Sequence, residues 1–292
     1  MTSLAVESPA KINLMLAVHG PRPDGFHALT SIMAPLTFGD RLQVSLSEAE
    51  ADSLRCDDPE VPTGSDNLIL RAAQLFRGAS GVRESFDFYL EKRIPMGAGL
   101  GGGSSNAAVA LKAMNELVGE PLDRQALLGI AADLGSDCPF FIDAKSARVS
   151  GRGEIISVLP KPIRERLSGQ RIALFRPHFG VPTAWAYACL RANGPESYEN
   201  EASARGRIEA FLSGGPLSDL LFNSFESSVG QKYLVIPCLL EALRGSGVAC
   251  LLSGSGSCCF ALLEGGTDLA ALRSLCERAF GPQSFFIESW LA

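Results

Sequence analysis

This 292-residue chain lacks the patterns that mark several common classes of protein. None of its eight cysteines stands in a C-x-x-C pair, it has only three histidines, and it contains no H-E-x-x-H, so a catalytic or structural zinc site is not indicated. No cluster of Lys and Arg occurs, and the formal net charge is -6. Because nucleic-acid binding requires a basic surface, no nucleic-acid partner is expected, and the acidic balance favours a small-molecule substrate.

Segments that would take the chain into or across a membrane are also missing. Met1–Glu7 has neither the basic start nor the apolar core of a signal peptide. The apolar stretch Val248–Leu263 is interrupted by Gly254–Ser257 and is too short to cross a bilayer. Cys258 and Cys259 are neighbours in this apolar stretch, as expected for reduced, mostly buried thiols. We therefore expect a cytoplasmic protein with no membrane partner.

The residues that are present predict two α+β domains. Hydrophobic residues make up 46% of the chain and charged residues 20%, which is enough to bury a sizeable core. Alternating or short apolar runs predict strands at 12–18, 41–46, 86–90, 171–176, 249–253 and 258–263. Helical spacing predicts helices at 67–76, 106–118, 124–134, 236–245 and 268–280, with Ser65 or Asp66 and Asp123 available as caps. Because the stretch around Pro160 and Pro162 is polar and charged, we place the domain boundary there, with domains at 1–163 and 164–292.

The strongest local signal is the run Gly97–Gly103, which has five glycines in seven residues. Such a run would weaken a helix or strand, but it lets the backbone come close to a bulky anion. Ser104 and Ser105 follow and are expected to cap an alanine-rich helix, whose free amide N–H groups and positive dipole end face the same point. A glycine loop that leads into a helix N-terminus predicts a phosphate-binding site.

Three other interpretations of this loop are a Walker A loop, a dinucleotide-binding loop and a glycine-rich hairpin without a ligand. A Walker A loop needs a lysine after the last glycine, and none follows here, so it is excluded. Gly97, Gly99 and Gly102 satisfy G-x-G-x-x-G, but the next helix leads into a second helix and not into a strand with an acidic end. That order argues against a dinucleotide fold. A glycine-rich hairpin without a ligand stays open as an alternative.

Three segments together resemble the motifs of the GHMP small-molecule kinases, in the same order and across nearly the whole chain. These segments are Ser8–Leu14, Pro95–Ala108 and Leu252–Cys258. Three further stretches narrow the resemblance to members that act on a cytidine diphosphate-linked methylerythritol in the non-mevalonate route to isoprenoid precursors: Arg22–His27, Gly135–Phe141 and Val181–Thr183. The resemblance implies a two-domain α+β kinase fold with the active site in the cleft between the domains, and phosphorylation of the substrate's 2-hydroxyl by ATP.

The same resemblance assigns the groups that handle ATP. Asp137 is implied as the base that takes the hydroxyl proton, although a carboxylate at this position could instead cap the next short helix. Lys11 is implied beside Asp137, where its charge would keep the carboxylate ionised, whereas a lysine considered alone would be surface charge. Mg²⁺ is expected with ATP, and Ser105 is the one side chain considered as its ligand. The implied ATP-binding residues are Pro95, Gly97, Gly99, Gly101, Gly102, Gly103, Ser104 and Ser105.

The acceptor-binding residues also follow from the resemblance. Phe26 would stack on cytosine and His27 would hydrogen-bond its edge, while the alternative is that the aromatic ring fills the core. The commoner residue at the position of Phe26 is Tyr; stacking survives this change, but any phenol hydrogen bond is lost. Tyr187 would supply the second face of the stack. The remaining predicted substrate contacts are Asn13, Thr183, Gly254, Ser255 and Gly256, with Asn13 otherwise an edge-strand polar residue and the last three otherwise a plain hairpin turn.

Two other functions stay open from the sequence. One is another GHMP kinase, acting on homoserine, mevalonate or a sugar; Phe26-His27 and the three consecutive glycines Gly101–Gly103 argue against it. The other is a nucleotide-binding regulator of the same fold without catalysis, and the presence of both Lys11 and Asp137 argues against that.

Overall fold

The computed structural model describes residues 3–292, so Met1 and Thr2, part of the stretch searched for a targeting signal, lie outside the described residues. The chain folds into two compact units, each assembled from separate stretches. Unit 1 contains the described part of residues 1–10 together with 38–96 and 101–145, and unit 2 contains 11–37, 97–100 and 146–292. The predicted domain boundary at 163/164 stays a prediction.

Two long strands run through both units, and in unit 1 they are extended by two more. The long strands are β1 (Ser3–Pro21) and β2 (His27–Ser47), and the added strands are β3 (Ser53–Cys56) and β4 (Ser85–Glu91). β4 pairs antiparallel with the end of β2 and parallel with β3. The predicted alternation of Phe86, Phe88 and Leu90 is confirmed, since all three side chains are fully buried.

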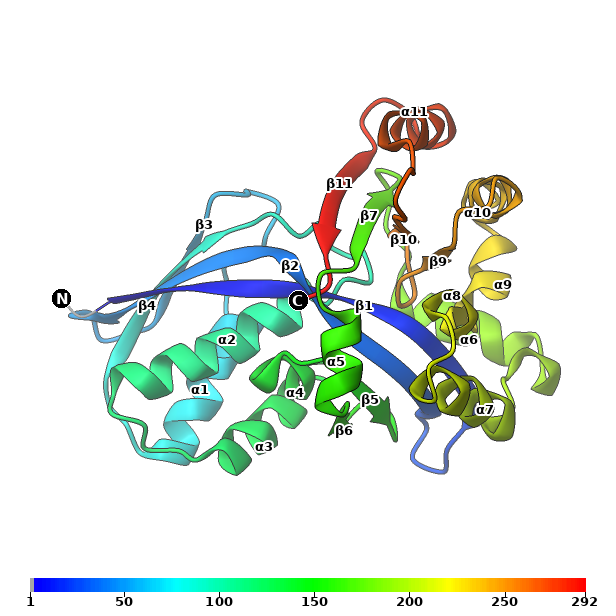
Figure 1. The fold of residues 1–292 in the computed structure, drawn as a ribbon. Helices are drawn as coiled ribbons and strands as arrows, with labels where there is room; N and C mark the ends of the chain where they lie inside the picture. Colours follow the sequence, from blue (N-terminus) through cyan, green and yellow to red (C-terminus); the bar gives the residue numbers. More distant parts are fainter. Residues whose placement is uncertain (1–2) are drawn as a thin grey trace. The chain divides into compact units, whose positions relative to one another are not determined.

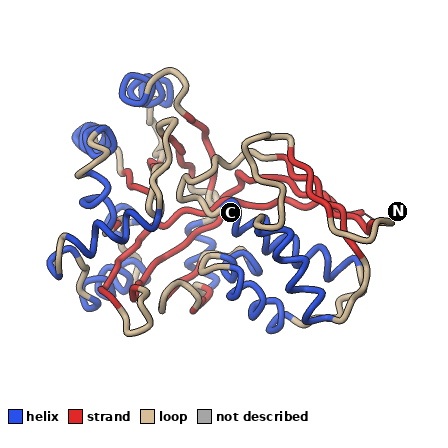
Figure 2. The backbone as a smooth tube through the Cα atoms, turned by 180° about the vertical axis from the view of Figure 1, so that it is seen from behind, coloured by secondary structure: helices blue, strands red, loops and turns tan. Residues whose placement is uncertain are grey.

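Four helices of unit 1 form a layer over one face of these strands (Figures 1 and 2). They are α1 (Leu68–Ser80), α2 (Gly102–Leu117), α3 (Arg124–Leu134) and α4 (Cys138–Asp143). The predicted bounds of α3 are confirmed, and Asp123 caps it by accepting from the amide N–H of Ala126 at 2.8 Å. α1 is capped by Asn67, which accepts from Ile69 N at 2.9 Å, so the expectation of a cap at Ser65 or Asp66 was wrong.

The start of α2 also differs from the prediction. The helix begins at Gly102 and not at Asn106, and its N-cap is Gly101, which has a left-handed φ of +73°. Ser104 and Ser105 lie inside the first turn, and the N-cap makes no side-chain hydrogen bond, so the expected serine cap is wrong. The physical reason is that Gly101 can turn the chain into the helix directly, since glycine adopts a left-handed conformation without strain.

Unit 2 contains the rest of the long strands and a separate sheet. β1 pairs parallel with β8 (Phe222–Asn223), and β2 pairs with the hairpin β5 (Ala147–Ser150) and β6 (Ile155–Val158). The separate sheet is antiparallel throughout, in the order β11 (Phe285–Trp290), β7 (Arg171–Arg176), β10 (Cys259–Leu262), β9 (Cys250–Leu252). The strands predicted at 171–176, 249–253 and 258–263 are confirmed, while the last strand of the chain was missed.

Helices surround the strands of unit 2. They are α5 (Lys161–Leu167), α6 (Thr183–Ala192), α7 (Glu201–Leu212), α8 (Leu217–Leu220), α9 (Phe225–Gly230), α10 (Val235–Gly245) and α11 (Leu269–Phe280), with a 3₁₀ turn at Pro195–Ser197. α10 and α11 pack together, one against β9 and the other against β7, which confirms the predicted α+β character (Figure 1).

The thiols lie as the sequence predicts. The eight cysteines are free, and five of them, Cys138, Cys250, Cys258, Cys259 and Cys276, are buried, as expected. Within residues 3–292, no helix has both the length and the apolar content needed to span a bilayer.

Candidate active site

Lys11 lies on β1 in unit 2 and is held by a chain of buried hydrogen bonds. Its ammonium donates to Asn13 Oδ1 at 2.7 Å, Asn13 Nδ2 donates to Ser31 Oγ at 2.8 Å, and Ser31 Oγ donates to the carbonyl of Met15 at 2.5 Å. The exposed fraction is 3% for Lys11 and 1% for Asn13, so neither is a surface residue. The interpretation of Lys11 as surface charge is therefore wrong. The chain of hydrogen bonds fixes the orientation of one buried cation.

The first half of the glycine loop is joined to the serine-glycine loop Ser253–Ser257. Lys11 N donates to the carbonyl of Leu100 at 2.9 Å, and Cys258 N donates to the carbonyl of Ala98 at 3.1 Å. The Ser253 hydroxyl donates to the carbonyl of Gly99 at 3.1 Å. A Cβ built on Gly99 would lie 2.1 Å from the carbonyl oxygen of Ser253, so only glycine allows the two loops to approach this closely.

The serine-glycine loop lies directly beside Lys11. A Cβ built on Gly254 would be 3.5 Å from Lys11 Nζ. The buried side chain of Asn223 holds the loop, because its Nδ2 donates to the carbonyls of Leu252 at 2.7 Å and Gly254 at 2.8 Å. Asn223 Oδ1 accepts from Phe225 N at 2.9 Å, which fixes the amide in turn. The loop is thus a turn that is held by the Asn223 side chain and lies next to the Lys11 ammonium.

Thr183 and Ser255, both predicted to contact substrate, are brought together in unit 2. Thr183 is the first residue of α6, and its Oγ1 lies 2.8 Å from Ser255 Oγ. Ser257 Oγ donates to the carbonyl of Phe179, which joins the loop to the segment before α6. These contacts give two hydroxyl groups at the edge of the loop.

His27 and Tyr187 also come together as predicted neighbours. Their ring centroids are 4.9 Å apart and their planes are inclined at 31°. His27 also contacts Tyr198, whose hydroxyl lies 3.5 Å from His27 Nε2. Burial lowers the pKa of His27, and the charge of Arg191 lowers it further, so the imidazole is neutral near pH 7.

Phe26 is exposed, with 49% of its surface accessible, so the alternative that it fills the core is wrong. The guanidinium of Arg152 lies 4.9 Å from the centre of its ring, within the range of a cation–π contact. Asp24 accepts from Phe26 N at 3.2 Å and pairs with Arg22, which shapes the turn. A ring held this way offers an aromatic surface to a ligand.

In unit 1, Asp137 and the start of α2 lie beside the same thiol. Burial raises the pKa of Cys138 to about 11, with a smaller opposing effect from the Ser104 hydroxyl and a further increase from the charge of Asp137. α4, which begins at Cys138, packs against α2. Asp137 occupies the N-cap position of α4 but makes no side-chain capping bond, so the interpretation of Asp137 as a simple helix cap is wrong.

The other residues predicted to bind ATP at the start of α2 present backbone N–H groups. Ser105 N donates to the carbonyl of Gly101 at 2.9 Å and is the first amide bonded within α2. The amides of Gly102, Gly103 and Ser104 precede it and carry the positive end of the helix dipole. The Ser105 hydroxyl is fully buried and accepts from Ser8 Oγ at 2.8 Å, so it does not fit the considered role of metal ligand.

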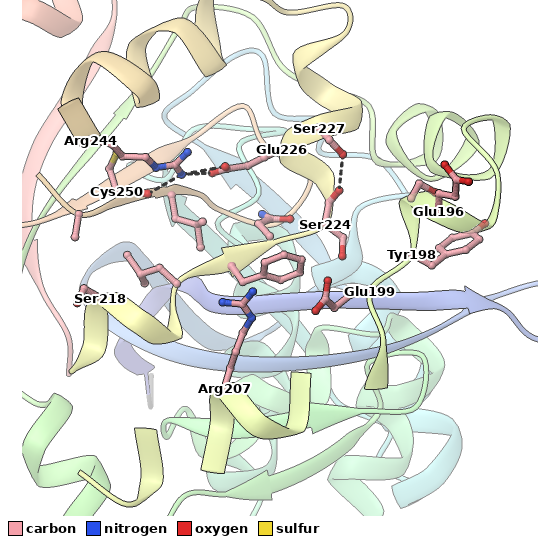
Figure 3. A pocket seen from close by; sticks show the side chains of 16 residues that line it. Glu196, Tyr198, Glu199, Arg207, Ser218, Ser224, Glu226, Ser227, Arg244 and Cys250 are labelled. Carbon is pink, nitrogen blue, oxygen red and sulfur yellow. Dashed lines mark hydrogen bonds and ion pairs between the residues drawn. The ribbon is translucent and has the colours of Figure 1, made fainter. Parts of the chain in front are cut away.

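A cavity of about 740 Å³ in unit 2 is lined in part by β9 residues that precede the serine-glycine loop (Figure 3). In its wall, Arg244 donates at 2.9 Å to both oxygens of Glu226 and to the carbonyl of Cys250. Glu226 also accepts from Leu252 N at 3.0 Å, which braces β9 just before the loop. Asn223 lines this cavity, while none of the residues predicted to bind substrate or ATP does.

Sequence reasoning missed the residues that support the site. Ser31 orients Asn13, Asn223 holds Gly254, Tyr198 contacts His27 and Arg152 contacts Phe26. Each is far in sequence from its partner, and none belongs to a motif. No local pattern could have found them.

The predicted residues divide between the units. Unit 2 holds Lys11, Asn13, Phe26, His27, Gly97, Gly99, Thr183, Tyr187 and Gly254–Gly256; unit 1 holds Pro95, Gly101–Ser105 and Asp137. The pairing of Lys11 with Asp137 and the cleft between the domains therefore stay predictions. Among residues 3–292, no group of three or more His, Cys, Asp or Glu side chains is arranged to hold a metal.

Both halves of the chain match known sequence families. The GHMP kinases N terminal domain matches residues 67–144, and the GHMP kinases C terminal domain matches residues 201–280. A 4-diphosphocytidyl-2-C-methyl-D-erythritol kinase of Synechococcus sp. (strain CC9902) is 38% identical over 271 residues, which covers 89% of this chain and 87% of the relative.

Solved structures share the fold over the full length. A crystal structure of 4-(cytidine 5'-diphospho)-2C-methyl-D-erythritol kinase has a TM-score of 0.78 and 33% identity, covering 99% of this chain and 100% of its own. A homoserine kinase from Cytophaga hutchinsonii has a TM-score of 0.72, covering 100% and 95%; at 18% identity it shows the fold alone.

The fold and the two loops thus define a GHMP kinase, the α+β class of small-molecule kinases that the three motifs predicted. Within that class, the chain belongs to the family of 4-diphosphocytidyl-2-C-methyl-D-erythritol kinases. The predictions of fold class and family are confirmed.

Proposed function

We propose that this protein transfers the γ-phosphoryl group of ATP to the 2-hydroxyl of 4-diphosphocytidyl-2-C-methyl-D-erythritol, a step of the non-mevalonate route to isoprenoid precursors. Relatives that carry this name are 34–39% identical along about nine tenths of the chain. The observation within the molecule that carries the proposal is the buried ammonium of Lys11, oriented by Asn13 and adjacent to Gly254. Phosphoryl transfer asks a protein mainly for positioning and for positive charge near the transferred group.

ATP binding is proposed at the start of α2. The amides of Gly102, Gly103 and Ser104 lie before the first intrahelical bond, and the helix dipole adds to their attraction for phosphate. Gly97 and Gly99 keep the preceding backbone free of side chains. Together these features support a phosphate cradle built from backbone groups, with no need of a Walker lysine.

Asp137 is the proposed base for the acceptor hydroxyl. Its position at the start of α4, where the Cys138 thiol lies beside both Asp137 and Ser104, supports a role for this carboxylate near the start of α2. In the proposed reaction Asp137 accepts the hydroxyl proton while Lys11 offsets charge on the transferred group. Asn13 has Lys11 and Ser31 as partners, and its second N–H remains to bind the acceptor.

The cytidine end is proposed at Phe26 and His27. The exposed ring of Phe26 offers a stacking surface, and the neutral imidazole of His27 can both donate and accept a hydrogen bond at the base edge. Tyr187 contacts His27 and is the proposed second aromatic wall. Thr183 and Ser255 supply hydroxyls for the polar part of the acceptor.

Mg²⁺ is proposed to arrive with ATP. We propose that the ion is held by phosphate oxygens and water together with one or two protein carboxylates, as is usual for Mg²⁺ at nucleotide sites. There it would neutralise the charge on the phosphates.

An ATP-consumption assay with the cytidine-linked substrate tests the proposal directly. Homoserine, mevalonate and galactose serve as alternative acceptors in the same assay. We expect turnover with the cytidine-linked substrate alone, and identification of the product by mass spectrometry. Turnover with another acceptor, or ATP binding without turnover of any acceptor, would reject the proposed function.

Two variants then test the roles of the charged residues. Asp137→Asn keeps the side-chain shape but removes the base, so kcat should fall about 10²–10⁴-fold. Lys11→Met removes the cation and should also lower kcat. If the two act together, the double variant should be little worse than the poorer single one. Circular dichroism and ATP binding must stay near wild type, and an unchanged kcat for folded Asp137→Asn would exclude it as the base.

A further inference from the structure

Asp40 in unit 1 is a buried carboxylate that no motif contains. Its exposed fraction is 0%, and it accepts four hydrogen bonds. Oδ1 accepts from the backbone N–H groups of Arg93 and Ile94, both at 2.7 Å. Oδ2 accepts from Lys92 Nζ at 2.5 Å and from Asn106 Nδ2 at 2.9 Å. These bonds use the full accepting capacity of an ionised carboxylate.

The partners of Asp40 lie on both sides of the glycine loop. Arg93 and Ile94 come immediately before Pro95, where the chain leaves β4, whereas Asn106 lies in the first turns of α2. One oxygen therefore binds the entry to the loop, and the other binds its exit. Asp40 fixes the separation of the two ends.

The same network reaches the first turn of α2. Asn106 Nδ2 also donates to Ser8 Oγ at 2.9 Å, and Ser8 Oγ donates to Ser105 Oγ at 2.8 Å. A Cβ built on Gly102 would lie 3.0 Å from Lys92 Nζ and 3.0 Å from Ile94 Cγ2, so the backbone at the start of the helix packs closely against two partners of Asp40. The amides proposed to bind phosphate begin at this residue.

Stability alone does not account for this arrangement. Desolvating two charges costs about as much as their attraction returns, so a buried ion pair is weak evidence for stabilisation. A carboxylate can bind donors at both of its oxygens, however, and an amide has only one oxygen. Binding both ends of the loop through one side chain therefore requires the two oxygens of the Asp40 carboxylate.

We infer that Asp40 is a positioning residue for ATP: it holds the entry and exit of the glycine loop so that the amides of Gly102–Ser104 face the phosphates. The inference rests on the proposed binding of ATP at α2. It predicts that loss of the second acceptor oxygen weakens ATP binding and leaves the acceptor site unchanged.

Asp40→Asn tests the inference, with Asp52→Asn as the matched control. Asp52 is also a carboxylate of unit 1 that binds a cation, Arg77 at 2.7 Å, and a backbone amide of β4, Phe86 N at 2.9 Å, but at the far end of that strand from the loop. Isothermal calorimetry gives the Kd for ATP, and steady-state kinetics give the KM for ATP and for the acceptor. We expect Asp40→Asn to weaken ATP binding by about 10-fold or more, which is a change of about 1.4 kcal/mol or more in binding free energy. The acceptor KM should change less than about twofold, and Asp52→Asn should leave ATP binding within the same limit.

Asp40→Asn leaves the Lys92 ammonium buried without its counterion, which can unfold the protein. The double variant Asp40→Asn/Lys92→Met removes that charge and should fold, yet it should still bind ATP weakly because Asn106 and the loop entry compete for one oxygen. Normal ATP affinity in the folded double variant, or an equal loss in Asp52→Asn, would overturn the inference. Because calorimetry measures ATP binding without turnover, a wild-type protein that binds ATP but phosphorylates no acceptor would reject the proposed reaction and leave this test intact.

Discussion

Replacing Gly99 with alanine should damage the protein far more than the same change at Gly97, two residues earlier. Both glycines have left-handed φ angles, +77° at Gly99 and +60° at Gly97. The surroundings differ: a Cβ at Gly99 would lie 2.1 Å from the Ser253 carbonyl oxygen, whereas no described residue comes within 4 Å of a Cβ at Gly97. The pair therefore separates backbone strain from steric conflict.

The magnitude follows from these two terms. A left-handed alanine costs about 1–2 kcal/mol at either position, and part of this is returned because alanine has less freedom than glycine in the unfolded chain. At Gly99 the conflict is with backbone atoms that cannot rotate away, and overpacking of this kind costs about 1–3 kcal/mol more. We expect a total loss of roughly 2–5 kcal/mol for Gly99→Ala and about 1 kcal/mol for Gly97→Ala.

Urea unfolding followed by circular dichroism measures the difference. The midpoint should fall clearly for Gly99→Ala and little for Gly97→Ala, with the slope of the transition unchanged in both. Since relief of the conflict must move Ser253–Gly256, the Gly99 variant should also lose kcat where it remains folded. Equal midpoints for the two variants would refute the idea that the two loops are held in contact at Gly99.

Three further predictions concern other parts of the molecule. Phe26→Ala should cost roughly 1–3 kcal/mol of base stacking, seen as weaker acceptor binding with ATP affinity intact; an equal loss for both ligands would contradict a role in the cytidine pocket. Because burial and then Arg191 lower the pKa of His27 below its unfolded value of about 6.5, its contribution to stability is present above that pH and is lost as the pH falls through the folded pKa. The unfolding midpoint of wild type should therefore drop more steeply between about pH 7.5 and 5 than that of His27→Gln, and parallel curves would contradict this. Cys238 is the one exposed thiol of the eight, and it should react with a thiol reagent in a fast phase that Cys238→Ser removes. The buried thiols, with pKa values raised by desolvation, should react only on unfolding. A fast phase that persists in Cys238→Ser would contradict this assignment.

Elements with local signals could be predicted from the sequence. α3 was found with its bounds because Asp123 caps it and Gly135 ends it, and β7 was found because an apolar run begins and ends in arginine. The start of α2 was placed too late. Glycine adopts left-handed and right-handed backbone conformations about equally readily. Nothing in the run of consecutive glycines therefore distinguished Gly101 as the one with the left-handed φ.

Buried polar residues on β1 were the second source of error. The predicted strand starts at residue 12, directly after Lys11, and already includes Asn13, while the observed strand begins at Ser3. Their burial is possible because Ser31 on the neighbouring strand completes the hydrogen bonds. A prediction made from one segment cannot take into account a hydrogen-bond partner, such as Ser31, that lies in another segment.

The sequence by itself determined the class of this protein, because three short motifs and the periodicity of the apolar residues are local properties that can be read along the chain. The tertiary structure decided which side chains support those motifs. Asp40 meets Asn106, and Asn223 meets Gly254, across separations that no spacing rule covers. The physical reason is that a buried polar group must find its partner among whatever segments folding brings beside it, and that choice is made in space and not along the chain.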